Sequence, residues 1–154
     1  MDIGDLLNPD AVLPNFRSTS KKQALQELAR AAAGLTGQDE RSIFDVLLER
    51  ERLGTTGVGN GIAIPHGKLP GLRQLYGIFA RLDRPIDFEA IDEQPVDLIF
   101  LLLAPEGAGA DHLKALARVS RQLRNGTYCD KLRGSDNRDA LYALLTEPAE
   151  NHAA

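Results

Sequence analysis

Apolar residues recur three and four positions apart in several stretches of the chain, which is the spacing of amphipathic helices. The first such stretch follows Ser20, a residue type that favours the N-cap, and Gln23 stands three positions later, as in a capping box. Gly34 is the first glycine after this apolar stripe. We therefore predict a helix that begins after Ser20 and ends near Gly34.

The same spacing predicts three further helices. One is expected over about residues 40–52, and a longer one over about residues 111–125. Asp111 is the expected N-cap of the longer helix, and Gly126 is expected to end it. The last helix is expected over about residues 137–146.

Four shorter apolar segments have the character of strands. The segment Val12–Phe16 is expected at a sheet edge, because Pro14 has no backbone N–H to donate to a neighbouring strand. The others are expected at residues 62–64, 75–82 and 96–104, and the last is so continuously apolar that we place it at the sheet centre. Strands and helices interleave along the chain, so we predict an α+β fold with helices on both faces of one sheet.

Composition narrows the class of protein further. The chain has 154 residues, 43 % of them hydrophobic, and a formal net charge of -4, which is typical of a soluble globular protein and argues against general nucleic-acid binding. We expect one domain over residues 1–148 and a flexible tail at 149–154. No apolar run is long enough to enter a membrane and no secretory signal precedes the domain, so we expect a cytoplasmic protein.

Charge is distributed unevenly along the chain. Residues 85–112 carry seven acidic and no basic side chains, whereas residues 113–138 carry seven basic and two acidic ones. Such a contrast can orient a charged partner, or it can be ordinary solvated surface.

The glycine-rich segment 54–61, which we expect to form a loop, completes no nucleotide-binding motif. A phosphate loop ending at Gly67-Lys68 requires glycine at position 62 and serine or threonine at position 69, where the chain has Ile62 and Leu69. The dinucleotide fingerprint fails at the same isoleucine. We therefore expect no nucleotide cofactor.

Metal and serine-hydrolase chemistry find little support either. The three histidines, His66, His112 and His152, lie far apart in the chain and have no cysteine at ligand spacing, so we expect no metal site. The single Cys129 excludes an internal disulfide. The Gly-x-Ser-x-Gly motif of serine hydrolases is absent.

Histidine chemistry is the remaining candidate, and it centres on His66. This residue follows a predicted strand, with Pro65 restricting the backbone on one side and Gly67 leaving space on the other. Its imidazole would be accessible to an incoming phosphoryl or acyl group. The alternative is a turn histidine in a glycine-proline corner.

Two further side chains could assist His66. Arg50 falls on or beside the apolar face of its helix, where a cation needs an anionic partner, which could be a bound group, Glu89 or Asp97, unless the side chain reaches solvent. His112 is expected in the first turn of a helix, where the helix dipole favours a neutral ring that can donate to an anion. It could also be a surface histidine. Together these residues suit reversible phosphorylation, with Arg50 and His112 stabilising the phosphoryl oxygens.

Three segments carry a resemblance to a known family; they read GTTGVGNGIAIPHGK at residues 54–68, AIDEQPVDL at residues 90–98 and DHL at residues 111–113. The chain resembles the IIA components of the bacterial phosphotransferase system, fructose/mannitol type, and is most similar to their nitrogen-regulatory branch. The resemblance extends over nearly the whole chain and implies a three-layered α/β/α fold with a mixed sheet, for which we expect about four to five strands.

The resemblance also implies a function and its partners. In the family, a histidine at the position of His66 accepts a phosphoryl group through Nε2 from an HPr-like carrier, NPr, which is fed by enzyme I and phosphoenolpyruvate. An arginine and a second histidine lie near that site, and Arg50 and His112 match them. The implied protein is a phosphoryl carrier rather than a free-standing enzyme, and it needs no bound cofactor.

Two functions from this family and one from another class remain open. The nitrogen-regulatory branch implies that the phosphorylation state of His66 controls targets linked to nitrogen metabolism and potassium transport. The alternative is a IIA component that passes phosphate to a IIB cysteine during fructose or mannitol uptake, although nothing after His66 resembles a IIB domain. A protein-interaction module that uses the acidic 85–112 segment without phosphorylation is the third possibility.

Two details of the site are our own hypotheses. Thr55, Thr56 and the N–H groups of their loop are expected to help hold the phosphoryl group. The docking surface for the carrier is expected to include acids of the 85–112 segment, namely Asp87, Glu89, Asp92, Glu93 and Asp97.

Overall fold

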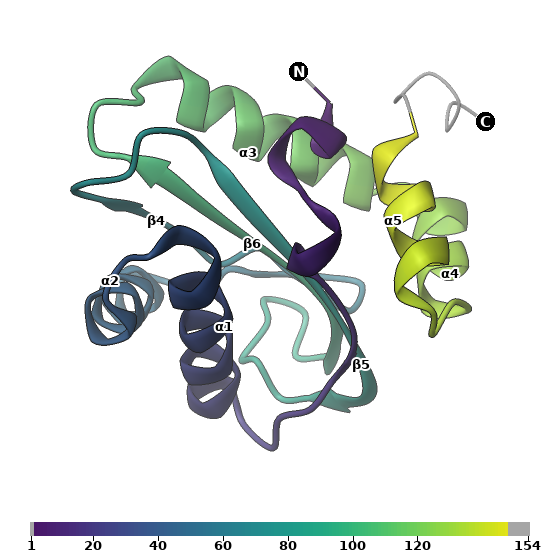
Figure 1. Cartoon of the computed structure of the whole chain (residues 1–154). Coiled ribbons are helices and arrows are strands. Elements are labelled where there is room, and N and C mark those ends of the chain that lie inside the picture. The colour runs from purple at the N-terminus through teal and green to yellow at the C-terminus, as the bar shows by residue number, and fades with distance from the viewer. Residues whose placement is uncertain (1, 148–154) are drawn as a thin grey trace.

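A computed structural model describes residues 2–147, which form three layers with a sheet in the middle (Figure 1). The helices α1 and α2 lie against one face of the sheet, and α3, α4 and α5 lie on the other side. The tail expected at residues 149–154 lies outside the described part of the chain. The elements are, in order, the 3-10 turns η1 (Ile3–Leu6) and η2 (Pro9–Ala11), β1 (Val12–Phe16), α1 (Lys21–Thr36), α2 (Glu40–Arg52), β2 (Gly57–Gly59), β3 (Ile62–Ala63), β4 (His66–Leu69), β5 (Tyr76–Ile86), β6 (Val96–Pro105), α3 (Ala110–Leu123), α4 (Gly126–Arg133) and α5 (Arg138–Thr146).

Within the described residues, the sheet has six strands and contains both parallel and antiparallel pairs. Its order is β1-β5-β6-β3-β2, and β4 pairs with β6 beyond the end of β3. The β5–β6 and β2–β3 pairs are antiparallel, whereas β1 pairs in parallel with β5, and β3 and β4 pair in parallel with β6. The predicted α+β fold with a mixed sheet is confirmed, with one strand more than the four to five expected.

The two strands that the sequence did not predict flank β3. The strand β2 lies within the glycine-rich segment 54–61, and β4 begins at His66, directly after the proline that was expected to end the preceding strand. Short strands of this composition show little alternation of apolar and polar residues. Whether such a segment forms a strand therefore depends on the strand it pairs with. For β4 that partner is the long, buried β6.

The segment that holds β3 and β4 follows β6 in one continuous register. Ile62 lies opposite Leu98 before the interruption at Pro65, and His66 lies opposite Leu102 after it. The carbonyl of Pro65 still accepts a hydrogen bond from the N–H of Leu102, at 3.0 Å. The register across Pro65 therefore places His66 at a defined level of the sheet.

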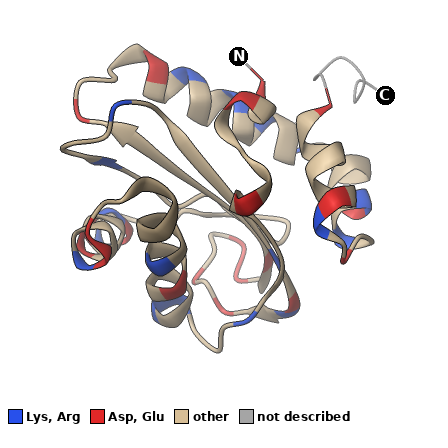
Figure 2. Cartoon of the chain, in the orientation of Figure 1, with Lys and Arg blue, Asp and Glu red and all other residues tan. Residues whose placement is uncertain are grey.

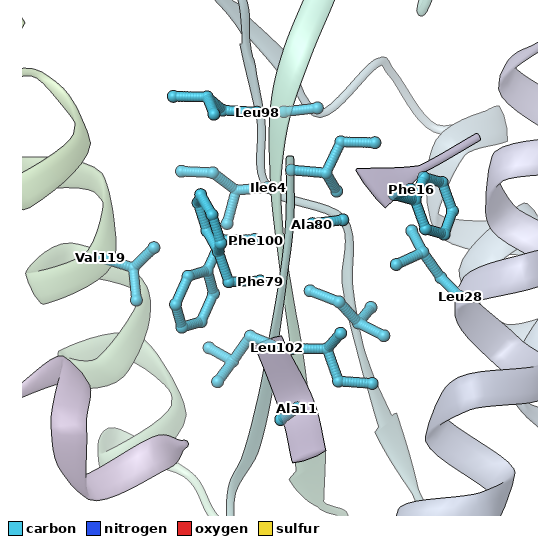
Figure 3. Packing of buried hydrophobic residues seen from close by; sticks show 14 of the residues in the cluster. Ala11, Phe16, Leu28, Ile64, Phe79, Ala80, Leu98, Phe100, Leu102 and Val119 are labelled. Carbon is cyan, nitrogen blue, oxygen red and sulfur yellow. The ribbon is translucent and has the colours of Figure 1, made fainter. Parts of the chain in front are cut away.

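The hydrophobic core lies on both faces of β6. Residues 98–103 of this strand are almost fully buried, which confirms the expected central position. In Figure 3 the side chains of Leu28 from α1 and Val119 from α3 lie on opposite sides of the strands, so each face of the sheet packs against its own helices.

The strand β1 lies at the sheet edge, as predicted, and pairs only with β5 among the described strands. Two arginines bond to its carbonyls. Arg138 donates from Nε to the carbonyl of Val12 at 3.1 Å, and Arg81 donates from Nη1 to that of Pro14 at 3.3 Å. Together with Pro14, they reduce the hydrogen-bonding capacity of the strand toward other chains.

Helix α2 has the predicted bounds, but α1 ends later than expected. Ser20 caps α1 by accepting from the N–H of Gln23, as predicted. Gly34 stays helical, and the helix ends at Gly37, which adopts the left-handed conformation with φ of 75°. A left-handed C-terminal residue is the position that favours glycine, so the second glycine ends the helix.

The C-terminal helices differ from the expectation at two points. The N-cap of α3 is Gly109 rather than Asp111, which lies in the first turn. The prediction that Gly126 ends this helix is wrong: α3 ends at Leu123 with Arg124 as its C-cap, and Gly126 opens the additional helix α4. The N-cap of α4, Asn125, accepts from the N–H of Tyr128 at 3.1 Å. The predicted last helix is confirmed as α5, with Asn137 as its N-cap.

The approach of α2 to β4 gives a test of the fold. A Cβ atom on Gly67 would overlap Cγ1 of Val46 on α2. We expect Gly67→Ala to lower the free energy of unfolding by about 1–3 kcal/mol, the usual effect of overpacking. Val46→Ala should recover part of this loss when combined with Gly67→Ala. Urea denaturation measures both, and equal losses from Gly67→Ala in the two backgrounds would contradict the contact.

Candidate functional site

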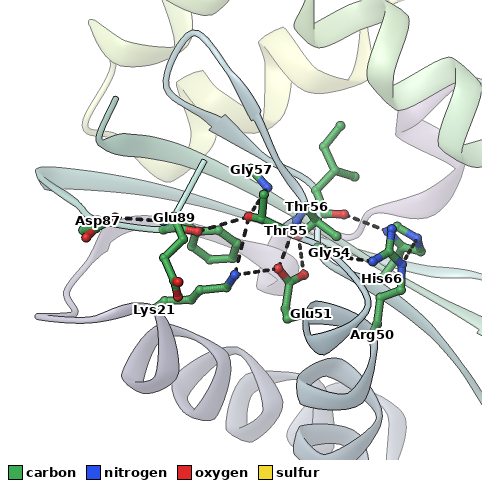
Figure 4. A network of polar contacts seen from close by, with 12 residues as sticks. Lys21, Arg50, Glu51, Gly54, Thr55, Thr56, Gly57, His66, Asp87 and Glu89 are labelled. Carbon is green, nitrogen blue, oxygen red and sulfur yellow. Dashed lines mark hydrogen bonds and ion pairs between the residues drawn. The ribbon is translucent and has the colours of Figure 1, made fainter. Parts of the chain in front are cut away.

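His66 is the first residue of β4, and its half-buried ring lies between two helices. On one side is Arg50, in the last turn of α2, whose Nε lies 3.3 Å from Nε2 of His66 (Figure 4). On the other side is His112, in the first turn of α3, with its ring centroid 5.7 Å away and the ring planes at 60°. The structure thus brings together all three residues that the sequence selected.

The hydrogen bonds of His66 determine its tautomer. Its Nδ1 lies 2.8 Å from the carbonyl oxygen of Ile64, which can only accept, so Nδ1 carries the proton. The guanidinium of Arg50 can only donate, so Nε2 of His66 accepts from it. Both partners therefore leave the lone pair of the ring on Nε2, the atom that faces the arginine.

The ionisation of His66 follows from its surroundings. Burial lowers the pKa of this imidazole below the ordinary value of 6.5, and the positive charge of Arg50 lowers it further. The Ile64 carbonyl and the Glu51 carboxylate oppose this effect without reversing it. The ring is accordingly neutral and nucleophilic near neutral pH.

His112 is buried, with only 7 % of its surface exposed. Its Nε2 has no hydrogen-bond partner within the described residues. Burial lowers the pKa of His112, and the nearby His66 and Lys68 lower it further. An unpartnered ring nitrogen is costly inside a protein, so its presence beside a nucleophilic ring indicates a position that a ligand atom completes. The sequence did not predict the depth of this burial.

Arg50 has neither of the partners considered for it, Glu89 and Asp97. It donates from Nη1 to the carbonyl of Gly54 at 2.9 Å and from Nε to His66. Asp97 instead pairs with Arg133 of α4, at 2.9 Å. Among residues 2–147, no carboxylate forms an ion pair with Arg50, so its positive charge is directed at the reactive ring.

A surface hollow of about 640 Å³ opens over these residues. Leu53 and Leu113 contribute to its wall, and they are 84 % and 68 % exposed, which is unusual for leucine. The full lining consists of Asp45, Val46, Glu49, Arg50, Leu53, His66, Gly67, Lys68, His112, Leu113 and Leu116. The reactive ring thus lies in an apolar surface that a partner protein could cover.

The acids proposed as a docking rim do not border this hollow. Asp87, Glu89 and Glu93 line a separate one with Ala90 and Pro95. In Figure 4 Asp87 and Glu89 lie at the far end of the polar network from His66, and Figure 2 shows the charged residues of the described part of the chain. These acids therefore lie away from the hollow, because the loop between β5 and β6 is at the other end of β6, and their part in docking the carrier stays a prediction.

The structure adds a buried acid that the sequence analysis missed. Glu51 follows Arg50 on α2 and accepts hydrogen bonds from the N–H and the hydroxyl of Thr56. It also pairs with Lys21 at 2.9 Å. The signal was present in the sequence, since Glu51 lies four residues after Leu47 on the apolar face of the helix.

This network engages the two threonine hydroxyls. Thr56 donates its hydroxyl proton to Glu51, and Thr55 donates its own to the carbonyl of Phe88 at 3.2 Å. Each hydroxyl has one proton to give. The hypothesis that these side chains donate to a phosphoryl group is therefore not supported in this conformation, and their contacts hold the loop instead.

Within residues 2–147, no group of three or more histidine, cysteine or acidic side chains is arranged to hold a metal ion. Over the same residues, no helix is both long and apolar enough to cross a membrane. His152 lies outside the described residues.

Comparison with known proteins places this chain in a family. The sequence model of the family described as "Phosphoenolpyruvate-dependent sugar phosphotransferase system, EIIA 2" matches residues 5–147. The chain is 65 % identical to a "Nitrogen regulatory protein" of Bradyrhizobium diazoefficiens, over 96 % of this chain and 97 % of that protein. A protein of the same name from Klebsiella oxytoca is 39 % identical, over 100 % of this chain and 96 % of that protein.

A solved structure agrees with these sequence matches. The crystal structure of "Nitrogen Regulatory Protein IIA-Ntr" from Neisseria meningitidis superposes with a TM-score of 0.88 at 33 % identity, covering 94 % of this chain and 99 % of that one. Both the sequence and the three-layer fold therefore assign the chain to the EIIA type 2 family of the phosphoenolpyruvate-dependent sugar phosphotransferase system.

Proposed function

We propose that this protein is a regulatory phosphoryl carrier of the nitrogen phosphotransferase system, which accepts a phosphoryl group on Nε2 of His66. The observation that carries the proposal is the pair of contacts on one ring: Ile64 holds the proton on Nδ1, and Arg50 lies at Nε2. The names of the similar proteins support the regulatory role. The donor is an HPr-like carrier, NPr, which receives phosphate from phosphoenolpyruvate through enzyme I in the cytoplasm.

The transfer step follows from the tautomer. The lone pair of Nε2 attacks the phosphorus of the phosphohistidine on the carrier, and a new P–N bond forms as the old one breaks. The electron pair of the broken bond returns to the ring nitrogen of the carrier. His66 keeps its proton on Nδ1, so its ring becomes cationic, and the carbonyl of Ile64 stabilises that positive charge.

Arg50 and His112 have complementary roles in this step. Arg50 releases Nε2 as the phosphoryl group arrives and donates to the phosphoryl oxygens. The unpartnered Nε2 of His112 donates a second hydrogen bond to them as a neutral N–H. Little covalent chemistry is required of the protein, because phosphoryl transfer depends mainly on alignment and charge stabilisation.

Phosphorylation changes the surface around His66. A phosphoryl group adds close to two negative charges in a hollow bordered by exposed leucines. The two forms therefore offer different surfaces to target proteins, for which nitrogen metabolism and potassium transport are the proposed contexts. Transfer of the phosphoryl group to a IIB cysteine is the alternative function.

The first prediction concerns the acceptor atom. On incubation with phosphoenolpyruvate, enzyme I and the carrier, we expect the protein to gain one acid-labile phosphoryl group. His66→Ala should abolish the gain because the nucleophile is lost, and His112→Ala should slow it about ten-fold or more because a donor is lost. Intact-mass spectrometry measures both. Full phosphorylation of His66→Ala would overturn the proposal, and transfer onward to a purified IIB protein would favour the alternative.

The second prediction concerns pH. Since burial and Arg50 lower the pKa of His66, its neutral form persists at lower pH than that of a free histidine. We expect an NMR titration of the ring to give a midpoint below 6.5, and His112 to behave likewise. As the pH is lowered, the rate of phosphorylation by preformed phosphocarrier should stay constant until the pH approaches that midpoint. A midpoint above 6.5 for His66 would contradict the electrostatic account.

The third prediction concerns docking. We expect Leu53→Gln combined with Leu113→Gln to raise the KM for the phosphocarrier about ten-fold, because docking would remove the apolar surface of these exposed leucines from water. The matched control is Ile91→Gln, since Ile91 is 71 % exposed but does not line the hollow. Steady-state phosphorylation rates measure both variants. Equal effects of the two changes would exclude the hollow as the docking surface.

A further inference from the structure

The carboxylate of Glu51 is buried in the last turn of α2, where its side chain is 3 % exposed. A buried carboxylate is costly unless it is paired and hydrogen-bonded, and Glu51 has both kinds of partner. Lys21 pairs with it at 2.9 Å, and the N–H of Thr56 donates to it at 2.9 Å, in addition to the bond from the Thr56 hydroxyl. Glu51 is the residue next to Arg50, which contacts His66. Its burial and its contacts therefore point to a role in the site.

Arg50 and Glu51 hold the two ends of one short loop. Arg50 donates to the carbonyl of Gly54, and Glu51 accepts from the N–H of Thr56, two residues further on (Figure 4). The backbone between these two contacts is therefore tied to the last turn of α2 on both sides. The N–H of Gly54 also donates to the backbone carbonyl of Glu51 at 3.1 Å. Loss of the contact at Thr56 therefore removes one of the attachments that position the carbonyl of Gly54 and the guanidinium bound to it.

Lys21, the first residue of α1, contacts both Glu51 and the loop. Its ammonium group lies 2.9 Å from Glu51 and 4.9 Å from the ring centre of Phe88, and it donates to the hydroxyl of Thr55 at 3.4 Å. The hydroxyl of Thr55 also accepts from the N–H of Gly57. These contacts give the buried carboxylate an oppositely charged partner and add a second attachment for the same loop.

We propose that Glu51 is a positioning residue for phosphoryl transfer: it anchors the loop of residues 54–56, whose Gly54 carbonyl orients Arg50 toward Nε2 of His66. The inference rests on the proposed function of His66 and adds a residue that touches neither the ring nor the phosphoryl group. Glu51 acts through Arg50, so its contribution depends on the arginine being present.

The charge of Glu51 allows a test that does not depend on phosphorylation, namely the NMR titration of His66. Its carboxylate is one of the groups that raise the pKa of His66 against the effect of burial. Glu51→Gln removes this charge while its amide oxygen can still accept from Thr56. We therefore expect Glu51→Gln to lower the NMR midpoint of His66. Glu27→Gln is the matched control, because it removes a partly exposed carboxylate that pairs with Arg30 on α1, and it should leave the midpoint unchanged.

A double-mutant cycle tests the route through Arg50. We expect Glu51→Ala to slow phosphorylation of His66 about ten-fold, since a small misplacement of a positioning group has effects of this size. In an Arg50→Ala background, the same change should slow it less than about two-fold, because coupled residues are not additive. Glu51→Gln should recover most of the rate, and Glu27→Gln should match the wild type.

The outcomes separate the possibilities. Equal losses from Glu51→Ala in both backgrounds, or no loss in either, overturn the proposal. If Glu51→Ala does not fold, as urea denaturation would show, Thr56→Val replaces it in the cycle, with an expected loss of about three-fold that likewise depends on Arg50. If the wild type accepts no phosphoryl group, the proposed function fails, and the ¹⁵N resonance of Arg50 Nε decides the positioning role: Glu51→Ala should shift it, Glu27→Gln should not, and an unshifted resonance overturns the role.

Discussion

The parallel pairing of residues 62–69 with β6 is the constraint on which the site depends. The carbonyls of Gly61 and Pro65 accept from N–H groups of β6, so the carbonyl of Ile64, on the alternate side of the strand, remains outside that ladder. It accepts from Nδ1 of His66 instead. One strand register thus determines the height of the histidine in the sheet and supplies the acceptor that sets its tautomer.

The two helices beside β4 supply the electrostatics of the site. The last turn of α2 brings the cation of Arg50 to Nε2, and the first turn of α3 brings a buried neutral ring, His112. Burial lowers the pKa of both histidines, so the positive charge of the site comes from Arg50 and Lys68 rather than from the imidazoles. This combination suits the dianionic phosphoryl group of the proposed transfer.

Much of this was predictable from local sequence signals. The bounds of α2, the capping of α1 by Ser20, the central β6 and the edge position of β1 follow from periodicity, capping preferences and proline chemistry. His66, Arg50 and His112 could be selected because each breaks a local pattern or carries a family resemblance. These signals require only neighbouring residues, which is why a single sequence was sufficient to find them.

The rest depended on contacts between segments that are distant in the chain. The strand β4 exists because β6 offers it a partner, and the acids of the loop between β5 and β6 lie away from His66 because β6 runs the length of the sheet. The hydroxyls of Thr55 and Thr56 turn away from the reactive ring because Phe88 and Glu51 take them as donors. The sequence by itself therefore determined which residue types carry the chemistry, and only the tertiary structure decided their partners, because hydrogen bonds and burial depend on which chain segments pack together.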